Sequence, residues 1–518
     1  MELVLVFLVL KTLAFIALMG FLSLVLQMCD SLILKPERLR SKLRKQGIRG
    51  PPPRFLLGNI AEMRKAKSKF SNSSKQEEQI ITHNCSSTLF PFFDGWRKEY
   101  GSTFMFSLGN IPILHTNNPE VVRETSKCTS LNLGKPSYQQ KERGALLGRG
   151  ILTSNGTEWA HQRRILAPEL YPEKVKNMIP SMVESSMLVI KSWADKLESE
   201  GGISEIKIDE CMRSFSGDVI SRACFGSNYS KGGEIFHKLR ALEEAMSRKV
   251  MSNGIPILRY LPTKSNREIW RLERELRDLI MSTVNDRTEP TSENDILHKI
   301  ISGASSSNVR KDCINRFIVD NCKNIYLAGY ETTAIAATWT LMLLASNPEW
   351  QEKVRVEVLQ VCGGQKPDSN TLLKMKTLTM VIQESLRLYP PVTVMSREAL
   401  QDMRFGNISV PKGVNIWTLN VTMHQDPEIW GPDAHEFNPE RFVNGVKAAC
   451  RFPHLFMPFG MGPRTCLGQH FAVAELKVLI SSLVSNFSFV LSPKYVHCPD
   501  LRLVTEPKYG VDLLVRRL

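Results

Sequence analysis

The stretch Phe459-Gly-Met-Gly-Pro-Arg-Thr-Cys-Leu-Gly468 places one cysteine between glycines, directly before an apolar run with helical character. Gly460 and Gly462 permit backbone angles that are closed to other residues, so the loop can fold tightly around Cys466. We expect a helix that begins near Leu467, whose free N–H groups would favour the Cys466 thiolate over the thiol. The alternative is a buried, unreactive thiol, which is the usual state of one cysteine among eleven.

The start of the chain is a second distinctive segment. Residues Leu3 to Leu26 are almost wholly apolar, interrupted by Lys11. As a helix they would rise about 36 Å, enough to cross a hydrocarbon layer of about 30 Å. A cleaved signal peptide is the alternative, but Glu2 stands where a signal peptide is basic, and no small-residue cleavage site closes the run. The sequence therefore predicts a transmembrane anchor over residues 1–28.

A basic segment follows the apolar run and contains the single acid Glu37. Its bases are Lys35, Arg38, Arg40, Lys42, Arg44, Lys45, Arg49 and Arg54. The positive-inside rule then predicts a single-pass protein whose main body is cytosolic. The segment carries +7 (eight bases minus one acid) of the chain's +15. Basic residues beside a membrane span usually meet anionic lipid headgroups, so no nucleic-acid binding is expected.

The domain organisation follows from these segments. Gly50-Pro-Pro-Pro53 predicts a stiff, extended stretch, so residues 29–54 form a basic and proline-rich hinge. Residues 55–518 then form one large domain, and 42% hydrophobic residues allow it a sizeable core. The cysteines include no CxxC pair and have irregular spacings, which predicts neither a disulfide framework nor a zinc site.

Three further patterns stand upstream of the cysteine loop. Trp159-Ala-His-Gln-Arg163 puts a tryptophan and an arginine on one helix face, and Ala328-Gly-Tyr-Glu-Thr-Thr333 lies inside a helical stretch from about Cys313 to Leu344. Glu384-Ser-Leu-Arg387 puts opposite charges on one helix face and is followed by Pro439-Glu-Arg-Phe442. Taken singly, each is more often a core tryptophan beside a surface arginine, a closely packed helix or a solvated ion pair.

Together and in this order, the patterns resemble the haem-thiolate monooxygenases of the cytochrome P450 family. The resemblance implies a mainly α fold with small β sheets and haem b as the cofactor. It implies Cys466 as the iron ligand and Thr332 and Glu331 in oxygen activation. It implies Trp159, Arg163, Arg397, Phe459, Arg464 and Gly468 around the haem, with Phe459 covering the sulfur and the arginines near the propionates. It also implies a buried network of Glu384, Arg387 and Arg441.

The resemblance also implies partners and a location. The chain has no GxGxxG or flavin motif, so its electrons would come from NADPH through a separate NADPH-cytochrome P450 reductase. The anchored form resembles members attached to the endoplasmic reticulum. An isomerase or dehydratase that rearranges a hydroperoxide without reductase, and a haem protein without turnover, are competing interpretations, and Thr332 argues against both.

The substrate prediction depends on a narrower resemblance. Segments 47–51, 54–59 and 259–266 resemble the plant group called clan 72, and Leu133-Gly-Lys-Pro-Ser-Tyr-Gln-Gln-Lys-Glu-Arg-Gly144 is similar to its gibberellin-oxidising branch and terpenoid-oxidising relatives. By analogy, mainly apolar residues would contact a hydrophobic small molecule: Leu152, Ile325, Ala328, Val392, Val394 and Leu503. Arg149 and Arg502 lie in the same regions. A gibberellin or related ent-kaurane diterpenoid is expected, with an oleanane-type triterpenoid as the alternative.

Overall fold

The computed structural model describes residues 2–73, 81–225, 229–248, 260–285, 295–305 and 311–518. Arg259, the first residue of one of the segments similar to clan 72, lies outside this range. The described chain is mainly helical with small sheets, which confirms the predicted fold class.

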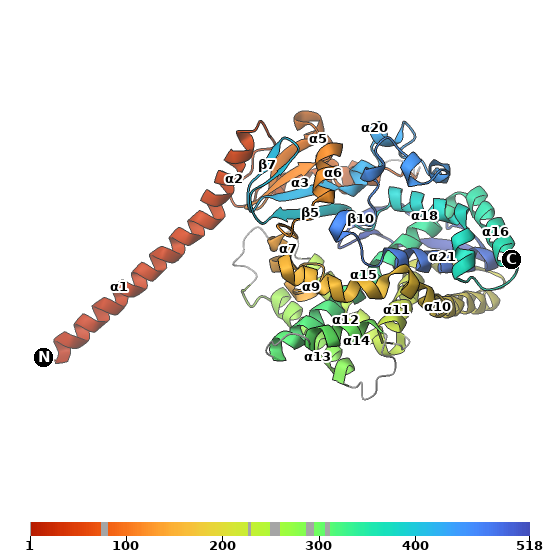
Figure 1. Cartoon of the computed structure of the whole chain (residues 1–518), viewed down its shortest axis with the longest axis horizontal. Coiled ribbons are helices and arrows are strands. Elements are labelled where there is room, and N and C mark those ends of the chain that lie inside the picture. Colours follow the sequence, from red (N-terminus) through yellow and green to blue (C-terminus); the bar gives the residue numbers. More distant parts are fainter. Residues whose placement is uncertain (1, 74–80, 226–228, 249–259, 286–294, 306–310) are drawn as a thin grey trace.

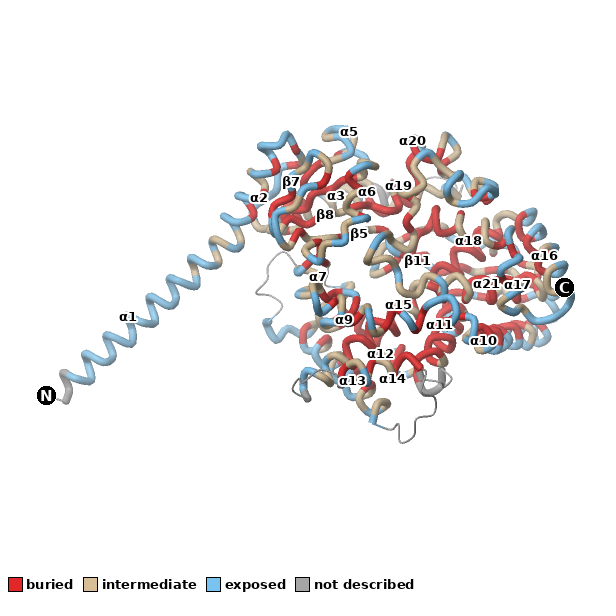
Figure 2. Tube along the Cα trace, in the orientation of Figure 1, coloured by how far each residue is buried: buried red, intermediate tan, exposed pale blue. Residues whose placement is uncertain are grey.

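Helix α1 (Glu2–Cys29) projects from the rest of the molecule as a single rod (Figure 1). Its apolar side chains are open to the surroundings along its length (Figure 2); Leu5, for example, is 67% exposed. Among the described residues, this is the one helix long and apolar enough to cross a membrane. Its exposed apolar surface fits a membrane anchor.

The segment after α1 differs from the hinge that the sequence predicted. The helix continues through a wide π turn (Asp30–Leu34) into α2 (Lys35–Arg44), so no break marks residue 28. Pro36 lies in the first turn of α2, directly after the π turn, and it has no N–H to donate to the preceding turn. The extended stretch begins only near Ile48.

Helix α2 belongs to the globular body. Leu39 and Leu43 are buried in a cluster with Met105, Leu114 and Ile416 of the largest sheet. Gln46, just beyond α2, exchanges two hydrogen bonds of 2.8 Å with the backbone of Ser409. Helix α1 is therefore joined to the domain through a packed element.

Four small sheets are formed by twelve strands among the described residues. The largest has the order β1-β2-β8-β5-β3; β2 pairs parallel with β8, and its other pairs are antiparallel. A three-stranded sheet has the order β4-β12-β9, and β6–β7 and β10–β11 are hairpins. The strands are β1 (Thr103–Leu108), β2 (Ile111–Thr116), β3 (Leu133–Gly134), β4 (Ile203–Lys207), β5 (Val394–Ala399), β6 (Met403–Phe405), β7 (Ile408–Val410), β8 (Asn415–Leu419), β9 (Phe487–Leu491), β10 (Pro499–Leu501), β11 (Thr505–Pro507) and β12 (Asp512–Arg517).

Helices make up the rest of the body. They are α3 (Ile60–Ser73), α4 (Cys85–Leu89), α5 (Pro91–Tyr100), α6 (Pro119–Lys127), α7 (Ser137–Glu142), α8 (Gly144–Leu147), α9 (Gly156–Leu166), α10 (Pro172–Ser199), α11 (Ile208–Phe225), α12 (Tyr229–Ser247), α13 (Lys264–Asn285), α14 (Ile296–Ser305), α15 (Lys311–Ser346), α16 (Pro348–Cys362), α17 (Ser369–Lys374), α18 (Lys376–Leu388), α19 (Asn420–His424), α20 (Pro427–Trp430) and α21 (Gln469–Asn486). Short 3-10 turns follow Leu166 and lie between α20 and α21.

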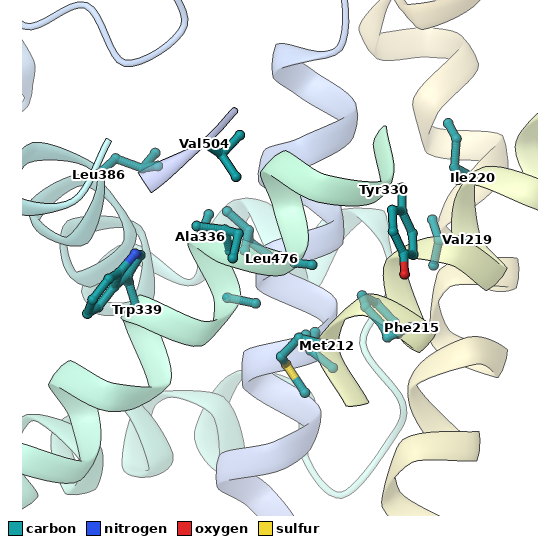
Figure 3. Packing of buried hydrophobic residues seen from close by; sticks show 14 of the residues in the cluster. Met212, Phe215, Val219, Ile220, Tyr330, Ala336, Trp339, Leu386, Leu476 and Val504 are labelled. Carbon is teal, nitrogen blue, oxygen red and sulfur yellow. The ribbon is translucent and has the colours of Figure 1, made fainter. Parts of the chain in front are cut away.

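The core is built around α15, which is buried over most of its length and packs on α11 and α21. Tyr330 lies against Phe215 and Val219 of α11 (Figure 3). Gly329 lets the two helices approach closely, since a Cβ there would lie 2.7 Å from the Ile220 side chain. The helix is continuous here, and the space left by the missing side chain is used for packing.

Candidate active site

The cysteine loop has the tight backbone that its glycines predicted. Gly460 and Gly462 both have φ near 71°, in the left-handed region that favours glycine. A Cβ on Gly462 would lie 1.8 Å from the carbonyl oxygen of Ser126, so no larger residue fits there. The Cys466 N–H donates to the Phe459 carbonyl at 2.8 Å, which closes the loop. Helix α21 begins at Gln469, two residues after the predicted start at Leu467.

Cys466 lies deep in the molecule and yet has an exposed surface, because it faces a cavity of about 1580 Å³. It is the one cysteine among the described residues that line this cavity. Burial raises the pKa of the Cys466 thiol above its usual value, while the Gly468 N–H and Arg163 lower it to a smaller extent. The sequence predicted that the helix end would favour the thiolate. Burial opposes this effect and raises the pKa of the thiol, so the positive charge of a bound metal would also be needed.

A cluster of cations lines the same cavity. Arg163, Arg397 and Arg464 line it together with Lys135, and none of the four has an acidic partner among the described residues. Burial lowers the pKa of Arg397 to about 10 and that of Arg464 to about 9. Buried cations without counter-ions are costly, so this cluster has the chemistry of a site for carboxylates.

The ring of Trp159 makes cation–π contacts with two of these cations. The guanidinium of Arg464 lies 4.1 Å from the centre of the Trp159 ring, and that of Arg163 lies 5.8 Å from it. Arg163 also donates to the carbonyl of Thr465 at 3.0 Å, next to Cys466. Helix α9 is thereby fixed to the cysteine loop.

Asn155 and Lys135 also take part in this cation cluster. Neither residue was predicted there from the sequence. Asn155 stands at the N-cap position of α9, but its side chain makes no capping bond. It accepts from the Lys135 N–H at 2.6 Å, donates to the Lys135 carbonyl at 2.9 Å and accepts from Arg464 at 3.1 Å. These bonds bring Lys135 beside Arg464 from a segment 329 residues earlier (464 minus 135). No local pattern could have predicted that contact.

Helix α15 places Glu331 and Thr332 on the cavity wall. The Thr332 hydroxyl donates to the Ala328 carbonyl at 2.7 Å, one turn earlier in the helix. Glu331 is 1% exposed and lies between two arginines, 3.4 Å from Arg213 and 3.1 Å from Arg240. The pair thus combines a hydroxyl on the cavity wall with an acid that is held by ion pairs.

Glu384, Arg387 and Arg441 are brought together away from the cavity. Arg387 makes two hydrogen bonds of 2.7 Å to Glu384, and both side chains are fully buried. Arg441 lies 3.5 Å from the same carboxylate and also pairs with Asp433. Arg387 further donates to the carbonyls of His424, at the end of α19, and Ala434, just after α20, so the network ties α18 to the long stretch that leads from α20 to the cysteine.

The expected substrate contacts all line the cavity: Leu152, Ile325, Ala328, Val392, Val394 and Leu503. Of the two arginines in these regions, Arg502 lines the cavity and pairs with Glu506 at 2.9 Å. Arg149 is exposed and is absent from the wall, because its backbone N–H is fixed to Asp320 while its side chain faces outward.

Comparison with known proteins bears on what this cavity holds. The family model described as Cytochrome P450 matches residues 79–513. The chain belongs to the cytochrome P450 family. It is 52% identical over 491 residues to Cytochrome P450 714C2 of Oryza sativa subsp. japonica, with 94% of each chain covered. It is 44% identical over 512 residues to Cytochrome P450 714A2 of Arabidopsis thaliana, covering 96% of this chain and 97% of the relative.

Cytochromes P450 are monooxygenases that bind haem iron through a cysteine thiolate. The cavity of this cytochrome P450 fits such a group on independent grounds. One cysteine is open to it, and the buried cations match the two acidic propionates of haem. At Gly468, an added Cβ would meet no protein atom within 4 Å, so protein packing does not require this glycine. A flat cofactor lying against the start of α21 would account for it.

Proposed function

We propose that this cytochrome P450 hydroxylates or epoxidises the carbon skeleton of a terpenoid, specifically a gibberellin or a related ent-kaurane diterpenoid. The observation that carries the proposal is the large cavity, whose wall combines Cys466, the Thr332 hydroxyl and the apolar contact residues. Haem bound at Cys466 supplies thiolate-ligated iron, which favours cleavage of the O–O bond of dioxygen. The apolar wall holds a hydrocarbon skeleton and excludes water from it.

In this proposal the chain's own residues bind the cofactor and deliver protons. Lys135, Arg163, Arg397 and Arg464 hold the propionates, and Phe459 covers the Cys466 sulfur. The Thr332 hydroxyl can turn from the Ala328 carbonyl to hold a proton over the cavity, and Glu331 is the adjacent acid that can renew it. Apolar side chains of α15 and of the loop before β5 orient the substrate.

We further propose that electrons arrive from NADPH-cytochrome P450 reductase, as is general in the family. The N-terminal helix would hold the protein in the endoplasmic reticulum membrane with the catalytic domain in the cytosol, because the bases follow the apolar run. A glycosylation-competent reporter fused after Leu518 should then stay unglycosylated. Glycosylation of that reporter would refute the topology.

The cofactor assignment is tested by the absorbance of the reduced protein with carbon monoxide. The wild type should give the band typical of thiolate-bound haem, and Cys466→Ala should abolish it. Cys498→Ala, which removes a cysteine outside the cavity wall, is the matched control and should keep the band. Rapid consumption of a hydroperoxide without reductase would instead favour an isomerase or dehydratase.

The oxygen-activation role is tested with Thr332→Ala. This variant should retain haem and still bind substrate, but it should divert electrons to peroxide, since protons then reach the wrong oxygen. Thr338→Ala, on the same helix but with a buried hydroxyl outside the cavity wall, is the control. Equal ratios of product to NADPH in wild type and Thr332→Ala would remove Thr332 from the mechanism.

The substrate is tested by co-expression with a plant reductase and feeding of gibberellins, kaurenoic acid and oleanane acids, followed by mass spectrometry. Oxidised gibberellins or kaurenoids are the expected products. Oleanane acids remain the alternative because the contact residues are apolar and do not select one terpenoid skeleton. Turnover of oleanane acids alone would refute the gibberellin assignment and leave the monooxygenase chemistry intact.

A further inference from the structure

A buried cluster of charges connects Glu331 to the C-terminal β10–β11 hairpin. Arg213 of α11 and Arg240 of α12 both lie between two carboxylates, Glu331 of α15 and Glu506 of β11. Arg502, in the turn of the hairpin, lies 2.9 Å from the other oxygen of Glu506. Four separate elements of the fold thus meet in one network.

The distances within the cluster are unequal. Arg213 lies 2.7 Å from Glu506 but 3.4 Å from Glu331, and it uses different nitrogens for the two carboxylates. Arg240 lies 3.1 Å from Glu331 and 3.9 Å from Glu506. Charge-assisted hydrogen bonds are strongest below about 2.9 Å, so Glu506 is the principal partner of Arg213 and Glu331 is held more loosely.

The balance of charges in the cluster also supports the assignment of Arg213 to Glu506 and the looser hold on Glu331. Three arginines (Arg213, Arg240 and Arg502) face three acids (Glu331, Glu506 and Glu244). A further acid, Glu243 of α12, is buried beside them. Burial and the charge of Glu331 raise the pKa of Glu243 to about 8, so it carries a proton at neutral pH. The remaining charges are matched, and removal of Glu506 would leave the arginines with an excess over acids.

The hairpin that carries Glu506 is firmly placed. The carbonyl of Thr505 accepts from the Trp339 indole N–H at 2.8 Å, and the Thr505 N–H donates to the carbonyl of Pro391 at 3.0 Å. Glu506 is itself buried. The Glu506 carboxylate therefore has a fixed position, from which it can attract both Arg213 and Arg240.

We propose that Glu506 is a positioning residue for Glu331. Glu506 binds Arg213 and attracts Arg240, so Glu331 is held loosely and is free to turn toward Thr332. This inference rests on the proposed proton-delivery role of Glu331. Without Glu506, Arg213 could direct both of its N–H groups to Glu331 and fix it as a bidentate pair. A fixed Glu331 would renew the Thr332 proton more slowly.

The test compares Glu506→Gln with Glu184→Gln, which removes an exposed acid of α10 that pairs with Arg222, outside this cluster. Full-length protein is reconstituted with reductase, and peroxide released per NADPH consumed is measured with and without kaurenoic acid. Glu506→Gln should raise this ratio about threefold, the size of a modest coupling energy between neighbouring groups. Glu184→Gln should leave it unchanged.

Further variants separate the inference from the proposed function. Glu331→Gln should raise the ratio, and adding Glu506→Gln to it should cause no further rise, because Glu506 acts through Glu331. A further rise in the double variant, or an unchanged ratio in Glu506→Gln, overturns the inference. If Glu331→Gln alone leaves the ratio unchanged, the proposed role of Glu331 fails, and the inference fails with it as a statement about catalysis.

A second measurement tests the contact independently of turnover. Thermal unfolding of wild type, the two single variants and the double variant should show shifts that do not add, because the two acids share two arginines. Additive shifts would refute the shared network. If Glu506→Gln does not load haem, Glu506→Asp keeps the charge on a shorter side chain. It should give a ratio between those of wild type and Glu331→Gln, and a wild-type ratio would count against the inference.

Discussion

At the scale of single residues, Glu475 of α21 is a carboxyl group enclosed by the core. Neither of its oxygens makes a hydrogen bond of normal geometry among the described residues. Burial raises the pKa of Glu475 to about 8, and the hydroxyls of Ser216 and Thr333 lower it to a smaller extent. The folded protein therefore keeps a proton at Glu475 at pH values where the unfolded chain has released it.

This proton makes stability depend on pH. Between about pH 4.5 and 8 the folded state binds the extra proton, so the free energy of unfolding should fall as pH rises, by roughly 1.4 kcal/mol per unit for this one group. Glu475→Gln should flatten that slope by this amount and be more stable than the wild type near pH 8. Denaturant unfolding across this range measures it. The exposed Glu173→Gln is the control, and an unaltered slope in Glu475→Gln would contradict the expectation.

Lys135 provides a second test at this scale. If it holds a propionate, Lys135→Gln should weaken haem retention by about 1.5–3 kcal/mol, the usual worth of a hydrogen bond to a charged group. Transfer of haem to an excess of a haem-free acceptor protein measures the loss rate. Lys141→Gln removes an exposed base of the neighbouring α7 and should keep the wild-type rate. Equal rates in both variants would exclude Lys135 from the propionate site.

At the scale of elements, the hydrogen bonds between α18 and the stretch that leads to the cysteine stabilise the site on the side away from the cavity. Arg387→Ala would leave Glu384 buried without its main partner, which costs about 3–5 kcal/mol. We expect a large loss of unfolding free energy and of haem incorporation. Arg516→Ala, on the exposed side of β12, should change stability by no more than about 0.5 kcal/mol. A similarly small change in Arg387→Ala would mean that the network does not brace the loop.

The elements also show what the sequence could and could not predict. The cysteine loop was predictable because its glycines and its cysteine lie within ten residues, and α15 was predictable from its length and apolar character. The helical continuation into α2 was missed because proline and basic residues resemble a hinge, although Leu39 and Leu43 share one buried face. Lys135, Asn155 and Glu506 gave no signal, because their partners lie far away in the sequence and meet them only in the fold.

At the scale of the whole molecule, the packed α2 predicts where the chain can be shortened. Deletion of residues 1–34 removes exposed apolar surface and should leave a partly soluble, haem-loaded domain. Deletion of residues 1–44 also removes the buried Leu39 and Leu43, each worth about 2–5 kcal/mol when lost from a core. Expression of both forms, with carbon monoxide spectra and unfolding curves, compares them. Equal stability would contradict the role of α2 in the domain.

The helical passage from α1 through the π turn into α2 has a mechanical consequence. The far end of this passage is packed on the largest sheet, and the places where such a helix can bend are the π turn (Asp30–Leu34) and Pro36. Any tilt of α1 in a bilayer that these two places do not absorb is passed to the catalytic body. Membranes of different thickness change the tilt of a spanning helix. The orientation of the domain relative to the lipid surface would therefore change with the thickness of the membrane.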